Sequence, residues 1–281
     1  MSPKLTQKIA FCVLFLATLL VIVPVFLVLA VIFRHGAAAI SWEFLTKMPT
    51  QGMRAGGILP AIVGTFYLVA GAVIFALPLG LFAAIYLSEY SKDTLMNRIV
   101  RLAIINLAGV PSVVFGLFGL ALFVGFFHFG ASILAGSLTL GVMILPVIIT
   151  SSREAFDSVP RSFRDVSESL GATKLQTIAH AVMPHAIPGI LTGTILGIGR
   201  AAGETAPILF TVAAFYLPRL PQGIFDQAMA LPYHLYVLST QVPNVDIKIR
   251  YGTALVLLVI VLLMNLIAIT IRSHYRAKKK W

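Results

Sequence analysis

Long uncharged apolar segments, separated by shorter charged ones, dominate the pattern of residues along the chain. An α-helix needs about 20 mostly apolar residues to cross a bilayer. Segments of this kind occur at Ile9–Phe33, Ile58–Leu87, Leu102–Phe127, Ala131–Ser151, Ile187–Leu217 and Tyr251–Ile271. The third and fourth share one uncharged stretch, which we divide at His128–Gly130, the only plausible turn in it. The pattern therefore predicts an all-α membrane protein with six transmembrane helices.

Details of the segments refine this prediction. The apolar part of a signal peptide spans about 7–15 residues. The first segment is much longer, so we expect it to remain in the mature protein. Pro78 predicts a kink in the second helix, which packed neighbours tolerate inside a membrane. The connections at residues 34–57 and 218–250 are rich in Pro, Gly and aromatic residues, which predicts structured surface loops or short interfacial helices.

Composition supports a chain whose main solvent is lipid. Hydrophobic residues make up 59% of the 281 residues and charged residues only 11%. A soluble domain has about 25% charged residues, so this chain lacks the polar surface to cover a soluble core. The net charge of +11 comes from basic residues at the ends of apolar segments. That placement indicates topology control and contact with anionic lipid head groups, and it argues against a nucleic-acid partner.

The distribution of Lys and Arg predicts the orientation of the spans. With the N-terminus inside, fourteen basic residues fall in inner segments and six in outer segments. Inner segments carry the excess of basic residues in membrane proteins, so both termini are expected in the cytoplasm. We divide the chain into an N-terminal helix and first periplasmic loop (1–57), a core (58–271) and a basic cytoplasmic tail (272–281).

The cytoplasmic segment from Ser152 to His185 has a pattern of its own, with two short amphipathic helices at about 161–184. For the first helix, Ser162 suits the N-cap and Gly171 the position after the last turn. Thr173 with Gln176 is a capping pair for the second, and Met183–Pro184 is expected to end it. Pattern alone leaves two interpretations open: helices that lie on the membrane surface, or a docking element for another protein.

The fifth apolar segment carries a glycine pattern and two charges. Glycines recur at Gly189, Gly193 and Gly197, followed by Gly203. Glycines four apart line one helix face and let a neighbouring helix approach closely, so we expect this helix to pack inside protein.

Arg200 and Glu204 lie four residues apart on the same segment. Each charge at membrane depth costs about 2.5–3.5 kcal/mol on insertion scales. The pair is therefore expected either to neutralise itself as a buried ion pair or to line a substrate path.

Several motifs resemble those of binding-protein-dependent ABC importer permeases, and among them the A-type subunit of the Pst phosphate family. Asp165–Ser167, Gly171 and Ala181–Pro184 are similar to the EAA loop of these permeases, although Asp165, Val166, Ser167, Ala181 and Met183 depart from its usual residues. The most specific match is Arg200–Pro207, with the sequence RAAGETAP. Further similar stretches are Gly56–Ile62, Pro111–Phe118, Ser169–Thr173 and Pro188–Gly193.

The resemblance implies a type I importer (MetI-like) permease in a bacterial inner membrane, with the cytoplasmic segment as the coupling helix that docks on an ATPase subunit. The residues expected to serve that coupling are Arg164, Asp165, Glu168, Gly171 and Ala172. The implied partners are two copies of the ATPase subunit, which would hold ATP and Mg, a related C-type permease subunit and an extracytoplasmic phosphate-binding protein.

The residue types of the fifth segment suit phosphate as the substrate. The planar fork of donors on Arg200 matches an oxyanion. Glu204 could accept a hydrogen bond from the O–H of HPO₄²⁻ or H₂PO₄⁻, which sulfate cannot offer, and Thr205 adds a hydroxyl. Pro207 is expected to kink the helix at this site.

Other classes of function remain as alternatives. The sequence has no Gly-x-x-x-x-Gly-Lys-Ser/Thr loop, so this chain is not expected to hydrolyse ATP itself, and no cofactor or metal is expected on it. His180 and His185 are expected to be ordinary surface histidines. A permease for sulfate or molybdate is one alternative function, and a proton-coupled secondary transporter is another.

Overall fold

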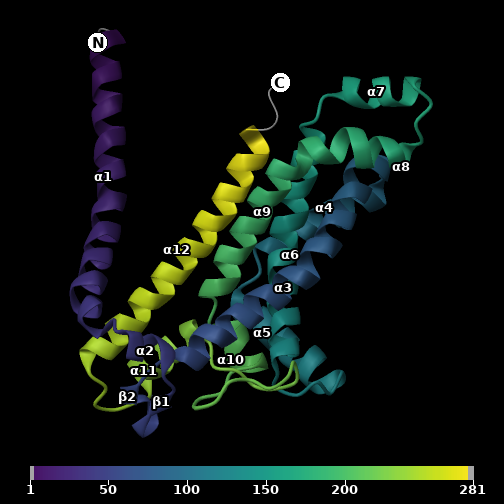
Figure 1. Cartoon of the computed structure of the whole chain (residues 1–281). Helices are drawn as coiled ribbons and strands as arrows, with labels where there is room; N and C mark the ends of the chain where they lie inside the picture. The colour runs from purple at the N-terminus through teal and green to yellow at the C-terminus, as the bar shows by residue number, and fades with distance from the viewer. Residues whose placement is uncertain (1–2, 278–281) are drawn as a thin grey trace.

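A computed structural model describes residues 3–277 as an almost entirely helical protein (Figure 1). The long helices are α1 (Pro3–Gly36), α3 (Leu59–Ile85), α6 (Ile133–Asp157), α9 (Met183–Gly203) and α12 (Ile247–Ala277). The shorter ones are α2 (Trp42–Thr46), α4 (Leu95–Ala108), α5 (Ser112–Gly119), α7 (Arg161–Ser169), α8 (Lys174–Gln176), α10 (Ala206–Thr211) and α11 (Leu231–Thr240). The π-helical segments η3 (Tyr86–Tyr90), η4 (Leu120–Phe126) and η5 (Thr177–Val182) extend α3, α5 and α8. A short 3₁₀ turn, η1 (Ala37–Ala39), follows α1, and a second, η2 (Gln51–Met53), connects the antiparallel strands β1 (Pro49–Thr50) and β2 (Ala55–Gly56).

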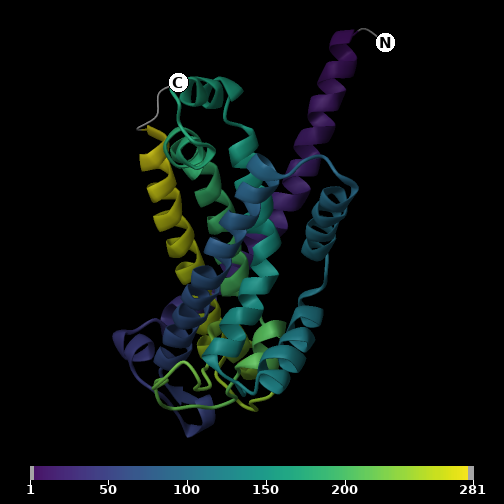
Figure 2. The ribbon, with the colours of Figure 1, turned by 90° about the vertical axis from the view of Figure 1, so that its right-hand side faces the viewer.

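Five of the six predicted spans are present as continuous helices, and the third is broken in two. Within residues 3–277, five helical stretches are long and apolar enough to cross a membrane, and the number becomes six if α4 and α5, bent by 103° at the break between them, count as one span. The prediction of a continuous helix over Leu102–Phe127 is therefore wrong. Pro111, at the start of α5, has an extended ψ of 141° and no N–H to donate, which ends the preceding helix. Figure 2 shows the two halves along the right-hand side of the molecule.

The fifth span also differs from the prediction, at both ends. Its helical stretch begins at Lys174, inside the segment predicted to be cytoplasmic, and ends at Gly203 rather than near Leu217. Residues 204–205 interrupt the helix before α10 begins. The prediction of a turn at His128–Gly130 is confirmed, since His128 and Gly130 both have positive φ, 56° and 67°.

The core of the protein forms where α3 and α6 pack side by side. In the apolar part of α6, 67% of the residues are buried, the highest share among the five continuous spans of residues 3–277. Small residues bring the two helices close together: a Cβ on Gly71 would lie 2.4 Å from Ser137 Oγ, and one on Gly80 would lie 2.7 Å from Ile148 Cγ2. A side chain at either glycine would therefore force a neighbouring side chain or helix to shift.

Helix α1 stands apart from this core. None of the 18 residues in its most apolar part is buried against the rest of the protein. It crosses α12 at one end only, where a Cβ on Gly36 would meet the Tyr251 carbonyl oxygen at 2.5 Å, and the two helices diverge toward the other end (Figure 1). Its exposed Leu, Val and Phe side chains therefore require an apolar environment outside this chain.

The connections separate into two ends of the molecule. Figure 1 shows α7 and α8 at the same end as the Pro3 end of α1 and the Ala277 end of α12, opposite the β1–β2 hairpin. The prediction of short ordered elements in 34–57 and 218–250 is confirmed by α2, the hairpin and α11. In the second connection, the Arg219 guanidinium lies 2.9 Å from the Asp226 carboxylate. That hydrogen bond holds the pKa of Asp226 below its ordinary value.

Candidate functional site

Arg200 and Glu204 face each other at the break between α9 and α10. Arg200 is in the last turn of α9, where a cation is favoured by the helix dipole. Glu204 follows the end of that helix with an extended backbone (φ −76°, ψ 138°). The Arg200 Nε atom lies 3.6 Å from Glu204 Oε1, and the side chains are 32% and 18% exposed. The two residues therefore form an ion pair, although they do not share one continuous helix.

This ion pair leaves donors of Arg200 free. A distance of 3.6 Å is longer than a hydrogen bond. Within residues 3–277, neither side chain makes a hydrogen bond to another part of the chain. An additional oxyanion could therefore approach the guanidinium without first displacing a tight bidentate contact.

Thr205 and Pro207 lie on the far side of the break. Thr205 is the half-buried N-cap of α10, and its side chain makes no capping hydrogen bond. Pro207 is buried in the first turn of α10. The prediction that Pro207 kinks a continuous helix is wrong, because the helix has already ended at Gly203 and proline is well suited to a first turn. Pro207 instead packs against α5, where a Cβ on Gly116 would lie 3.0 Å from its Cα.

The glycines of α9 divide into two groups. A Cβ on Gly189 would lie 2.4 Å from Ala155 Cβ, and one on Gly193 would lie 2.5 Å from Ser151 Cβ, so the predicted close approach of a neighbouring helix, α6, is confirmed for both. A Cβ on Gly197 would be at ordinary contact distance, 3.5 Å from Ile144. A Cβ added to Gly203 would have no atom of residues 3–277 within 4 Å, so this glycine packs against no other helix in the described part of the chain, and its packing role stays a prediction. This glycine lies at the helix end, beyond the crossing.

The segment between α6 and α9 turns sharply at Gly171. Gly171 has a φ of +81°. Its N–H donates to the Glu168 carbonyl at 2.9 Å, and the Ala172 N–H donates to the Ser167 carbonyl at 3.2 Å. These two hydrogen bonds form a Schellman motif, which places Gly171 at the predicted position after the last turn of α7.

The ends of the two loop helices differ in how well the sequence predicts them. Thr173 and Gln176 form the predicted capping box at the start of α8. The prediction of Ser162 as N-cap is wrong, because Pro160 occupies that position. The prediction that Met183–Pro184 ends the second helix is also wrong. Pro184 lies in the first turn of α9, and the wider π-helical turns of η5 precede it, so the helix continues into the fifth span.

Part of the surface of this loop is apolar. Val166, Leu170 and Leu175 are 61%, 83% and 69% exposed. A groove of about 460 Å³ lies beside them, lined by Ser162, Phe163, Val166, Ser167, Leu170, His180 and Ala181. Asp165 and Glu168 are exposed, and Ala172 is half-buried. We call the three exposed apolar side chains, Val166, Leu170 and Leu175, the docking surface, after the role that the sequence predicts for this loop.

Two residues of this segment lie further inside than the sequence predicts. Arg164 is expected at the surface as a polar contact or solvated charge, but its side chain is only 18% exposed and binds Glu89, whose side chain is 7% exposed. His185 is half-buried, with its ring 4.6 Å from that of Phe163. Glu89 is a residue that sequence reasoning misses. The one signal for it is a carboxylate that directly follows a long uncharged span.

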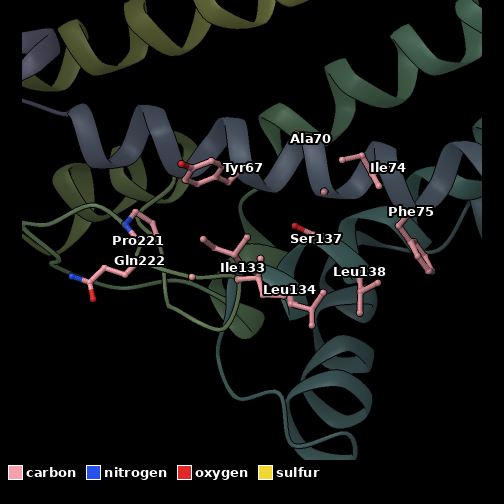
Figure 3. Close-up of a pocket in the computed structure, with 13 residues that line it drawn as sticks. Tyr67, Ala70, Ile74, Phe75, Ile133, Leu134, Ser137, Leu138, Pro221 and Gln222 are labelled. Carbon is pink, nitrogen blue, oxygen red and sulfur yellow. The ribbon is translucent and has the colours of Figure 1, made fainter.

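An apolar cavity of about 670 Å³ lies between α3, α6 and the loop at 221–224 (Figure 3). Tyr67, Ile74 and Phe75 face it from α3, and Ile133 and Leu138 face it from α6. None of its lining residues is charged. A desolvated anion would lack compensation there, so this cavity does not belong to the charged site at Arg200.

Comparison with known proteins identifies the family of the chain. Residues 76–280 match the model of the binding-protein-dependent transport system inner membrane component. The chain is 32% identical to a probable ABC transporter permease protein, YqgI, of Bacillus subtilis, over 95% of each chain. It is 33% identical to the phosphate transport system permease protein PstA 1 of Mycobacterium tuberculosis, over 96% of this chain and 89% of the relative.

A solved structure shares the fold. The permease of an inward-facing MetNI methionine ABC transporter superposes with a TM-score of 0.61 at 15% identity, over 78% of this chain and 97% of the other. This likeness confirms the predicted type I importer fold. The chain therefore belongs to the family of binding-protein-dependent transport-system inner-membrane components, as a multi-pass ABC importer permease of the PstA type.

Proposed function

We propose that this permease forms the membrane path of an ATP-driven phosphate importer, with Arg200, Glu204 and Thr205 lining the path. The observation that carries the proposal is the loose ion pair at the α9–α10 break, with an Nε–Oε1 distance of 3.6 Å. The similarity to a phosphate transport system permease supports phosphate as the substrate. The free donors of Arg200 would bind phosphate oxygens, and Glu204 would accept the hydrogen bond of a protonated phosphate oxygen.

The coupling surface of the proposal is the docking surface on α7 and α8. Three exposed apolar side chains, Val166, Leu170 and Leu175, would enter a groove of the ATPase subunit, and the exposed carboxylates of Asp165 and Glu168 would fix the register. The sharp turn at Gly171 and Ala172 holds the two arms of the surface together. Members of this family hydrolyse ATP on separate subunits, so ATP and Mg would bind there and no cofactor would bind this chain.

The complete importer would contain two ATPase subunits, a C-type permease subunit and an extracytoplasmic phosphate-binding protein. Both termini would face the cytoplasm, at the end of the molecule that carries α7 and α8. The N-terminal helix with the first periplasmic loop (1–57) would flank the core (58–271). The boundary of the proposed tail at residue 272 falls inside α12, which continues to Ala277, and residues 278–281 lie outside the described part of the chain.

A double-substitution cycle tests the substrate path. Arg200→Gln, Glu204→Gln and the double variant are compared with wild type for phosphate uptake, normalised to assembled complex. Each single substitution strands a charge and is expected to lower the amount of complex. The double variant should assemble yet transport little phosphate, because the cation in the path is gone.

The outcomes separate the alternatives. Near-normal uptake by the assembled double variant would show that the pair is only a scaffold. Uptake of sulfate in place of phosphate by the wild-type complex would favour the sulfate or molybdate alternative. Uptake that persists when no ATPase subunit co-purifies would favour a secondary transporter.

A further inference from the structure

The π-helical segment η3, at the cytoplasmic end of α3, contacts three different elements through three consecutive side chains. Ser88 Oγ donates a hydrogen bond to Asp157 Oδ1 of α6 at 2.6 Å. Glu89 binds Arg164 of α7, and the ring of Tyr90 lies 4.8 Å from Lys174 Nζ of α8. The end of α3 is therefore attached to α6 and to both arms of the loop that carries the docking surface.

The contact between Arg164 and Glu89 is the most extensive of the three. Arg164 Nε donates to Glu89 Oε2 at 3.1 Å, and Arg164 Nη2 donates to Glu89 Oε1 at 2.5 Å. The other donors reach the end of α6: Nη1 donates to the Val159 carbonyl at 2.8 Å and Nη2 to the Phe156 carbonyl at 3.0 Å. One guanidinium thus fixes α7 to both α3 and α6. Only arginine has this planar fork of donors, so lysine could replace the charge but not the geometry.

The surroundings of the pair make this attachment rigid. Ala84 of α3, Phe156 and Val159 at the end of α6, and Val182 at the start of the fifth span form one buried apolar cluster. Phe163, one residue before Arg164, packs against it. A displacement of α7 therefore cannot be absorbed by loose packing around Arg164.

Helix α3 leads from this attachment to the opposite end of the protein. It packs along α6, and near its first turns Thr65 Oγ1 accepts a hydrogen bond from the Leu231 N–H at 2.9 Å, at the start of α11. A movement imposed at Glu89 is thus carried along a helix that contacts the connections at the far end. By contrast, Asp165 and Glu168 on α7 are exposed and bind no residue of this chain through their side chains within residues 3–277.

We propose that the Arg164–Glu89 ion pair is the internal linkage that makes α3 and α6 follow the docking surface when the ATPase moves it. The inference rests on the proposed function, because it assumes that an ATPase binds this surface. Arg164 and Glu89 are positioning residues in this proposal, since neither touches the substrate. Their role is to keep the docking loop and the spans in one body, so that ATP hydrolysis and opening of the path stay coupled.

The decisive quantity is phosphate transported per ATP hydrolysed, measured with the complete importer in proteoliposomes. Arg164→Gln and Glu89→Gln each strand a buried charge and should lower the amount of assembled complex. The complexes that do assemble are expected to keep the ATPase subunit and its hydrolysis while transport per ATP falls about tenfold, within the usual range of coupling between sites. Arg164→Lys should restore the amount of assembled complex but only part of the ratio, because the fork is absent. The matched control is Arg98→Gln, which breaks an Arg–carboxylate pair with Asp93 whose side chains are 65% and 64% exposed. Its ratio should equal that of wild type.

A second variant removes both charges without leaving either one unpaired. Arg164→Met with Glu89→Leu keeps the site filled by apolar side chains of similar length, so the complex should assemble even if the single variants do not. The expected result is normal ATPase binding with a low transport ratio. A wild-type ratio in this variant, or loss of ATPase binding, would overturn the linkage and make the pair a scaffold for the loop. Failure of the wild-type complex itself to retain an ATPase or to transport phosphate would instead refute the proposed function.

Discussion

Replacing Gly189 by alanine tests the close packing of α9 against α6. The added Cβ would lie 2.4 Å from Ala155 Cβ and 3.3 Å from Ala155 Cα. Carbon atoms in contact are separated by about 3.5–4.0 Å, so the helices must separate locally by about 1.1 Å or more. Neither atom is the end of a flexible side chain. Overpacking of this kind typically costs about 1–3 kcal/mol, whereas glycine to alanine in a helix gains at most about 1 kcal/mol.

The net expectation is a loss of about 1–2 kcal/mol for Gly189→Ala, which corresponds to about 2–8 °C in the unfolding midpoint of a protein this size. The shift is measured by heating the protein in detergent and recording the fraction of protein that remains monodisperse at each temperature. Gly203→Ala is the matched control on the same helix, since no atom of the described residues lies within 4 Å of an added Cβ there. It should be neutral or slightly stabilising.

A compensating substitution makes the test specific. Ala155→Gly removes the atom at 2.4 Å, so the nearest neighbour of the new methyl group becomes the Cα atom of residue 155 at 3.3 Å. The double variant should therefore be more stable than the sum of the single effects predicts, with a coupling energy of about 1 kcal/mol or more. Equal stability of Gly189→Ala and wild type, or additive effects in the double variant, would refute the packing argument.

Three further predictions concern other parts of the molecule. Gly171→Asp should leave the protein in the membrane but uncouple ATP hydrolysis from transport, because an L-residue is strained at a φ of +81°; normal transport per ATP would contradict this. Burial lowers the pKa of His234 to about 4 in the folded protein, compared with about 6.5 in the unfolded chain. Below about pH 6.5 the unfolded chain therefore binds more protons than the folded protein, and about 2 kcal/mol of stability should be lost between pH 7 and pH 5. His234→Gln should flatten that pH dependence, and an unchanged slope of the unfolding midpoint against pH would exclude His234 as its source. A tag inserted at Gln222 should react with an impermeant reagent in intact cells and one at Lys280 only after lysis; the reverse pattern would invert the orientation.

The sequence alone determined the features that depend on local chemistry. The six apolar segments could be found in the sequence because a helix that crosses a bilayer needs about 20 mostly apolar residues, whatever its neighbours are. The turn at Gly171 and the capping box of Thr173 with Gln176 were predictable because their hydrogen bonds join residues at most five positions apart. Gly189 and Gly193 predicted a closely packed helix face because residues four apart lie on the same side of a helix.

Tertiary structure decided the rest. Arg164 has its partner 75 residues away, and only the tertiary fold, which brings α7 beside η3, makes a buried ion pair of a residue that resembles a surface charge. Gly203 continues the glycine pattern but lies beyond the crossing with α6, so it packs against no other helix within residues 3–277. The helix continues through Pro184 and ends before Pro207, although both prolines carry the same local signal. A proline stops a helix only where its missing hydrogen bond and its ring cannot be accommodated, and the neighbouring turns and helices determine whether they can.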